Sequence, residues 1–88
     1  MKKIVFSQHA LEQMPDRGAT REEVEITIRD GERTAAKTGR VAFRKNFVFL
    51  QYWKEHYYEA KQIMSVVVDK DDRIIVITVY VFYFGGKR

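Results

Sequence analysis

The spacing of apolar residues changes near residue 33 of the chain. Before that point, apolar residues recur at helical spacing, as in Ala10, Leu11 and Met14, which is typical of short amphipathic helices. After it they follow a period of two, which indicates β-strands. The pattern therefore predicts an α+β domain in which helices precede a sheet.

Two helices are expected in the first third of the chain. Ser7 is a good N-cap for a helix over 8–14, and Pro15 should stop or kink that helix because it lacks an amide proton and clashes with the preceding turn. The segment TREE at 20–23 is a capping box that opens a second helix through Arg29, with Gly31 as its stop.

Strands are expected at 3–6, 41–53, 57–69 and 73–84, with turns at 54–56 and 70–72, while 34–39 holds a weaker strand or a loop. We therefore expect a single domain over 1–88. Its two N-terminal helices would pack on one face of a four-stranded antiparallel meander, with three to five strands as the range. Strand 3–6 would lie at an edge or in the middle.

The strands carry more apolar surface than two short helices can cover. In 73–84 the odd positions 75–81 are aliphatic and the even ones are more aromatic, and in 57–69 apolar even positions alternate with Glu59, Lys61 and Ser65. The segment 47–53 is apolar on both sides. We therefore expect an uncovered face that includes some of the following aromatic residues: Phe47, Phe49, Trp53, Tyr80 and Phe82.

Three interpretations of that face remain open. It could form a homodimer or a partner-protein interface, which is the usual fate of exposed apolar patches. It could stack the bases of single-stranded RNA beside the cationic Arg40, Arg44 and Lys45. Strong curvature of the sheet could instead turn it into an extra layer of core.

Charge and composition narrow the classes of function. The net charge is +4, and residues 33–54 carry six basic and no acidic side chains, which indicates either a polyanion partner or a solubilising hairpin. The chain has no cysteine, which excludes disulfides and cysteine-based zinc sites. The apolar runs are too short for an export signal or a membrane helix, so we expect a cytoplasmic protein without membrane contact.

A polar row lies at the start of the chain. On a helix that begins at Gln8, His9 and Gln13 are four residues apart, and Arg17 continues the row if Pro15 only kinks the chain. Imidazole can accept and return a proton near neutral pH, and guanidinium binds phosphate. His9 and Arg17 could thus serve RNA cleavage by the 2′-hydroxyl, although such a row is also typical of a solvated helix face.

Other chemistries have little support in the sequence. His9 and Glu12 could share a metal, but a third ligand is missing, so no metal site is predicted. His56 is interpreted as a turn residue. The chain contains no glycine-rich phosphate loop and no serine nucleophile elbow, and no cofactor is expected.

Two blocks resemble a known family. SQHALEQMPDRGATREEVEITIRDGE and SVVVDKDDRIIVITVY are similar to the small bacterial domain family of unknown function numbered 4258, and together they span about half of the chain. That family is similar to the RelE/ParE-like toxins, including the BrnT type. The resemblance implies a RelE-like α+β fold, metal-independent ribonuclease activity and an antitoxin partner.

The resemblance places His9, Arg17 and Tyr80 on residues of the family pattern. His9 would then act as acid or base, Arg17 would bind phosphate, and Tyr80 would stack on a base or relay a proton. The basic residues Arg40, Arg44 and Lys45 lie in a segment that the family pattern matches only loosely, and we expect from their charge that they hold the RNA backbone. Gln13 stands where the family pattern has arginine, and a neutral amide cannot neutralise a phosphate. The alternative is a non-catalytic domain that forms a homodimer or binds a partner protein.

Overall fold

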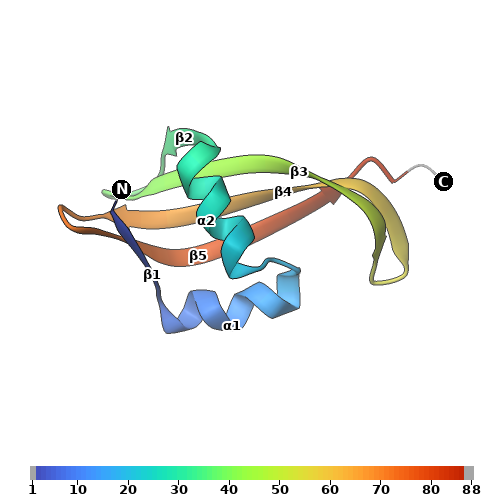
Figure 1. The fold of residues 1–88 in the computed structure, drawn as a ribbon, viewed down its shortest axis with the longest axis horizontal. Coiled ribbons are helices and arrows are strands. Elements are labelled where there is room, and N and C mark those ends of the chain that lie inside the picture. The colour runs from blue at the N-terminus through green and yellow to red at the C-terminus, as the bar shows by residue number, and fades with distance from the viewer. Residues whose placement is uncertain (1, 87–88) are drawn as a thin grey trace.

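A computed structural model describes residues 2–86 of the chain. Two helices lie against a twisted five-stranded sheet (Figure 1). Along the chain the elements are β1 (Lys3–Phe6), α1 (Gln8–Arg17), α2 (Arg21–Asp30), β2 (Glu32–Ala35), β3 (Val41–Trp53), β4 (His56–Asp69) and β5 (Arg73–Phe84). The α+β class, the two helices and a sheet within the expected range of strand number are therefore confirmed.

The sheet is mixed, which corrects the expectation of a purely antiparallel meander. Its strand order is β1-β5-β4-β3-β2, and β1 runs parallel to β5 at one edge while the other pairs are antiparallel. Parallel neighbours need a long connection, and nearly the whole chain lies between β1 and β5. The local pattern of residues 3–6 carries no information about this distant pairing.

Helix α1 continues through Pro15 to Arg17, so of the two effects expected of this proline, a stop or a kink, the stop is wrong. The proline lies only two residues before the helix ends at Arg17, so its missing hydrogen bond affects only the last turn. The real stop is Gly18, which has a left-handed φ of 81° and donates its N–H to the carbonyl of Met14 at 2.9 Å. Ala19 donates to the same carbonyl at 3.0 Å.

Helix α2 has the expected capping box. The Thr20 hydroxyl accepts from the Glu23 amide, and the Glu23 carboxylate accepts from the Thr20 amide, both at 3.1 Å. The helix ends at Asp30, one residue later than expected. Gly31 follows in an extended conformation. A glycine allows β3 to pack closely here, because a Cβ at this position would lie 2.5 Å from the Arg44 carbonyl oxygen.

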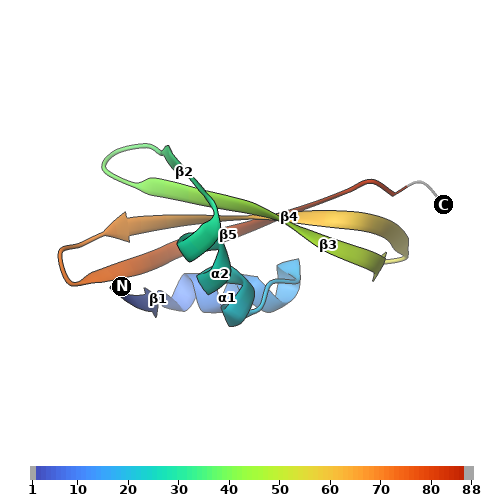
Figure 2. The same cartoon turned by 45° about the horizontal axis from the view of Figure 1, so that its top comes forward.

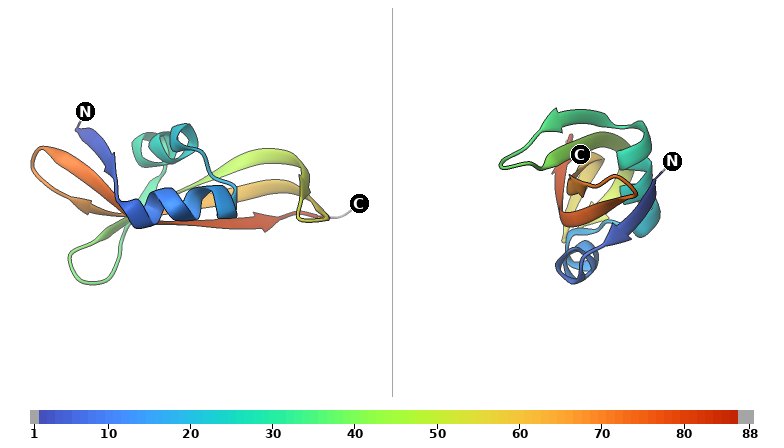
Figure 3. Two further views of the ribbon diagram at one scale, coloured as in Figure 1. Left: turned by 90° about the horizontal axis from the view of Figure 1, so that it is seen from below. Right: turned by 90° about the vertical axis from the view of Figure 1, so that its left-hand side faces the viewer.

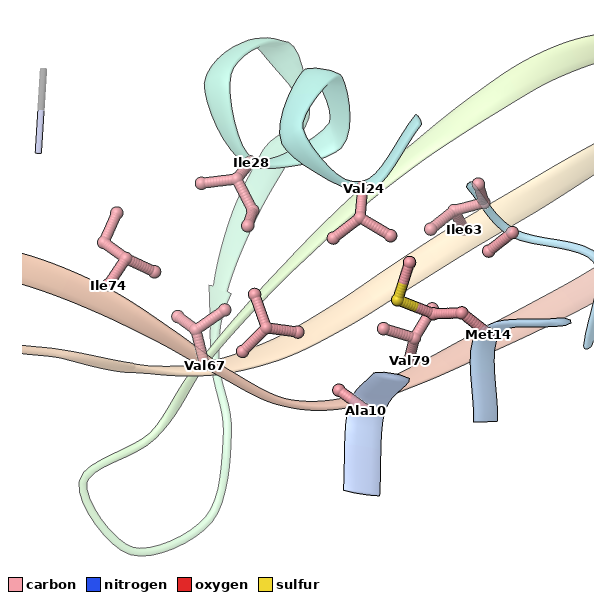
Figure 4. Packing of buried hydrophobic residues seen from close by; sticks show 10 residues of the cluster. Ala10, Met14, Val24, Ile28, Ile63, Val67, Ile74 and Val79 are labelled. Carbon is pink, nitrogen blue, oxygen red and sulfur yellow. The ribbon is translucent and has the colours of Figure 1, made fainter. Parts of the chain in front are cut away.

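Both helices contribute to one apolar core (Figure 4). Helix α2 covers β3 and β4, whereas α1 lies along β5, and Figure 2 shows the long strands crossing one another above the two helices. The buried core residues are Ala10, Met14, Ala19, Val24, Ile28, Ile63, Val67, Ile74, Val76 and Val79. Neither helix in the described part of the chain is long and apolar enough to cross a membrane.

Strand β4 faces the helices with the opposite side from the one its sequence indicates. Lys61, Ile63, Ser65 and Val67 are buried, while the even positions expected to be inside are only half-buried. The alternation is misleading because Lys61 has buried partners of its own: its Nζ donates to the Gly18 carbonyl at 2.8 Å and to Glu23 at 3.0 Å. A charge that is paired in this way can lie inside.

Strand β5 changes its buried side at an irregularity. Its register with β4 shifts between Val66 and Val67, which pair with Thr78 and Val76, so one extra residue of β5 is inserted. The even position Val76 is therefore buried before the shift, and the odd position Val79 is buried after it. The simple odd-against-even pattern predicted for this strand is wrong in its first half.

Candidate functional site

The polar row of α1 lies beside the outer edge of β5. The Gln13 side-chain oxygen accepts from the Thr78 hydroxyl at 2.6 Å and from the Val79 amide at 3.1 Å. The Arg17 guanidinium donates to the Val79 carbonyl at 2.8 Å. These two side chains satisfy backbone groups that a neighbouring strand would otherwise bind, which is a structural use of the row.

The structure brings Arg17 and Tyr80 together and leaves His9 apart. The guanidinium of Arg17 lies 5.2 Å from the centre of the Tyr80 ring, a cation–π contact. His9 is exposed in the first turn of α1. Arg17 comes eight residues later, about 12 Å along the axis at 1.5 Å per residue. His9 and Arg17 therefore occupy opposite ends of the helix.

The half-buried Tyr83 and the buried Lys61 fix the position of Arg17 by holding the end of α1. The Tyr83 hydroxyl donates to the Arg17 carbonyl at 2.8 Å, and Lys61 donates to the next carbonyl, that of Gly18. Burial, followed by the nearby Glu23 carboxylate, raises the pKa of Tyr83 to about 12. The phenol therefore stays protonated and keeps donating at neutral pH.

The basic residues of the central segment do not form one cluster. Arg40 is exposed in the loop before β3, and Arg44 is exposed on β3, where it contacts Glu32 at 3.0 Å. Lys45 points to the opposite face, over the Phe47 ring at 6.0 Å, because successive residues of a strand alternate sides. Of these three residues, only Arg44 shares a row of the sheet with Tyr80.

A surface without a helix lies on the other side of the sheet, as the end-on view in Figure 3 shows. We call it the open face. The strand register arranges it in three rows across β3, β4 and β5, which are Arg44–Met64–Tyr80, Asn46–Gln62–Phe82 and Val48–Ala60–Phe84. Tyr80, Phe82 and Phe84 are 40%, 48% and 44% exposed, which is unusual for large apolar side chains on a folded domain.

The chemistry of the open face combines three kinds of group. The rings of Tyr80 and Phe82 are nearly parallel, at 19° and 6.4 Å between centres. The middle row adds an amide pair, in which Gln62 donates to Asn46 at 3.0 Å. Arg44 and Arg17 supply positive charge at the two ends of the first row. Such a surface can stack flat rings, bind their polar edges and attract anions.

An open cavity of about 240 Å³ adjoins the open face. Its walls are the end of α1, the turn after β3 and the outer edge of β5, and its lining residues are Asp16, Arg17, Trp53, Lys54, Tyr80, Val81, Phe82 and Tyr83. Trp53 stacks on Tyr83 at 5.2 Å, on the helix side of the strand. Within residues 2–86 no three potential metal ligands gather in one place.

The sequence predicts part of this surface. Tyr80 and Phe82 are among the aromatic residues expected on an uncovered face, whereas Phe84, Gln62 and Asn46 are not. Phe47, Phe49 and Trp53 are expected there too, but they lie on the helix side, where Phe47 packs on the core and the other two contact Tyr83. The alternation 80, 82, 84 was the signal for Phe84, whereas the amides depend on cross-strand register.

One comparison with known proteins gives a match. Residues 6–81 match the model of a family described as Domain of unknown function (DUF4258). Neither the curated proteins nor the solved structures contain a significant match to the chain. The match begins at the last residue of β1 and ends within β5, one residue after Tyr80. It therefore includes Arg17, Arg44 and Tyr80 but not Phe82 or Phe84.

Proposed function

The chain belongs to the DUF4258 family, and we propose that it binds single-stranded RNA on the open face of its sheet. The observation that carries this proposal is the exposed pair of parallel rings, Tyr80 and Phe82, with the Arg17 guanidinium against Tyr80. Aromatic side chains beside cations are how proteins hold unpaired bases and their phosphates.

The polar groups of the open face support the same proposal. Within residues 2–86, the ion-pair partner of Arg44 is the exposed Glu32, and surface pairs of this kind contribute little, so a phosphate can replace the carboxylate. The Asn46–Gln62 amides can donate to and accept from the edges of bases stacked beside them. The net charge of +4 favours encounter with a polyanion.

A salt titration tests the phosphate contacts. We expect Arg44→Gln to make the slope of log K against log salt for a fluorescent single-stranded RNA shallower by about 0.7, the amount expected for one lost phosphate contact. Arg73→Gln is a matched control, because both arginine side chains are 45% exposed and each contacts a carboxylate. An equal change in both variants would point to net charge alone.

The aromatic contacts are tested in the same anisotropy assay. Tyr80→Ala should weaken RNA binding roughly 5- to 150-fold, because a stacked base contributes about 1–3 kcal/mol. Tyr52→Ala removes a tyrosine that is 69% exposed on β3 outside the three rows, and it should leave affinity unchanged. Wild-type protein that is folded but has no RNA affinity would contradict the proposed function.

The finer form of the proposal is a toxin-type, metal-independent ribonuclease in which His9 moves the proton. It rests on the resemblance to RelE-like toxins and requires His9 to reach RNA held by the open face. Incubation with labelled RNA in EDTA tests it, together with growth arrest on expression. Both effects should disappear in His9→Ala, whereas intact RNA from a folded, RNA-binding protein would limit the function to binding.

The second candidate is a non-catalytic protein interface, with an antitoxin-like chain as the kind of partner the resemblance implies. The observation in its favour is Val48, which is 81% exposed in the same row of the open face as Phe84, with Ala60 between them. Apolar side chains in such numbers usually bury against protein. Protein without RNA affinity, whose binding of a partner chain is abolished by Phe82→Glu, would favour this candidate.

A further inference from the structure

The outer edge of β5 is covered along only part of its length. Strand β1 pairs with Arg73–Val76, and α1 takes over where β1 ends. The Ser7 hydroxyl donates to the Ile77 carbonyl at 3.2 Å, while Gln13 and Arg17 bind the amide and the carbonyl of Val79. Beyond Val79, no strand within residues 2–86 pairs with this edge, and the end of α1 lies across the open cavity from it.

Two residues of β5 leave their backbone groups unpaired there. Both backbone groups of Val79 point away from β4, and this direction alternates along an antiparallel pair, so those of Val81 and Tyr83 point outward too. No hydrogen bond found within residues 2–86 uses the amides or carbonyls of these two residues on that side. Both residues line the open cavity between α1 and the turn after β3.

We propose that a second copy of this chain occupies the cavity by pairing its own β5 antiparallel to this edge. The pairing would have a two-fold axis at Phe82, with Val81 opposite Tyr83 of the second copy. Each such pair exchanges two hydrogen bonds, so the symmetric interface forms four. The unpaired groups on one copy are thus complementary to the same groups on the other.

Neighbouring registers are less favourable. If Val81 faced its own copy, Tyr83 would lie opposite Val79, whose backbone groups α1 already binds. If Tyr83 faced its own copy, Val81 would lie opposite Gly85, whose carbonyl already accepts from the Glu59 amide at 3.2 Å. The register centred on Phe82 leaves all four groups free to pair.

The exposed aromatic residues support a second copy over an unrelated peptide. In this register Phe82 faces Phe82, and Tyr80 faces Phe84 of the second copy, so the three exposed rings of each chain meet across the axis. Both open faces then lie on the same side of one continuous sheet. This inference goes beyond the proposed function, since the dimer would form without RNA and would double the surface offered to it.

The interface is short, so the dimer should be weak. A few residues on each side bury less than the roughly 800 Å² per partner of a standard interface. We therefore expect a concentration-dependent dimer with a Kd of the order of micromolar in sedimentation equilibrium, and a monomer for Val81→Pro. Proline at this position removes only an outward amide, a substitution that edge strands tolerate.

Single cysteines test the register, because the natural chain has none. Two copies of Phe82→Cys would face each other with Cα atoms about 4.5 Å apart, within the range a disulfide spans, and should form a covalent dimer on mild oxidation. Tyr80→Cys is the control: its two copies would be about 14 Å apart along the strands, so it should link only when mixed with Phe84→Cys.

Several outcomes would overturn the proposal. They are a wild-type chain that is monomeric at high micromolar concentration, a folded Val81→Pro that still dimerises, or Tyr80→Cys that links to itself as readily as Phe82→Cys. Circular dichroism confirms the fold of each variant. Because no RNA is present, failure of RNA binding does not affect these results, and loss of the dimer leaves the anisotropy assay interpretable.

Discussion

Lys61 and Ser65 lie four residues apart on the buried side of β4, and their polar groups are accommodated differently. Lys61, only 5% exposed, is paired with Glu23 and a backbone carbonyl. The Ser65 hydroxyl is fully buried and has no hydrogen-bond partner within residues 2–86. The lysine therefore locks α2 and the end of α1 onto the sheet, whereas the serine hydroxyl costs stability.

Removal of the Ser65 hydroxyl should stabilise the protein. We expect Ser65→Ala to raise the free energy of unfolding in urea by about 1 kcal/mol, because it removes an unsatisfied buried group. Ser7→Ala is the same chemical change at a hydroxyl that accepts from the Ala10 amide and donates to Ile77. Ser7→Ala should lower that free energy by about 1–2 kcal/mol. If both variants were less stable than wild type, the Ser65 hydroxyl could not be an unsatisfied group that costs stability.

Tyr83 should make stability depend on alkaline pH. Its pKa is raised to about 12, so the folded state favours the protonated phenol and the stabilisation is fully present below pH 10. It is lost as the pH rises from 10 through 12. Tyr83→Phe should lower the free energy of unfolding by about 1 kcal/mol at pH 8, with a smaller difference from wild type at pH 11. A difference that grows with pH would contradict this.

At the scale of elements, α1 acts as a cap for the edge of β5. Gln13→Ala should leave the Val79 amide and the Thr78 hydroxyl without their partner and lower the free energy of unfolding by about 1–3 kcal/mol. Gln8→Ala is the control on the same helix, because Gln8 is exposed and its side chain donates to the exposed Glu12. Urea unfolding should show a change within about 0.5 kcal/mol for the control.

The elements show where local sequence patterns are sufficient. Caps and turns are local, so Ser7, the Thr20–Glu23 box and the turn at 70–72 were predictable. The helix end expected at Met14 was wrong because a proline so near the C-terminus of a helix disturbs only the last turn. The buried side of β4 and the inserted residue of β5 depend on partners in other elements, which no periodicity can reveal.

At the scale of the whole molecule, the pairing of distant strands creates the candidate site. The period of two predicted an uncovered aromatic face, and Tyr80 and Phe82 lie on it. The three rows that bring Arg44 and the Asn46–Gln62 pair beside these rings arise from register across β3, β4 and β5. The parallel pairing of β1 with β5 also joins residues far apart in the chain, so the local sequence pattern could not predict it.

The most direct test of RNA binding on the open face is an amide and side-chain NMR titration with a short single-stranded RNA. We predict that the largest shift changes fall on Tyr80, Phe82, Gln62 and Asn46, while α2 residues such as Glu22 and Glu25 stay unchanged. Changes confined to α2 or to the loop at 36–40, or no changes at saturating RNA, would contradict the proposed site.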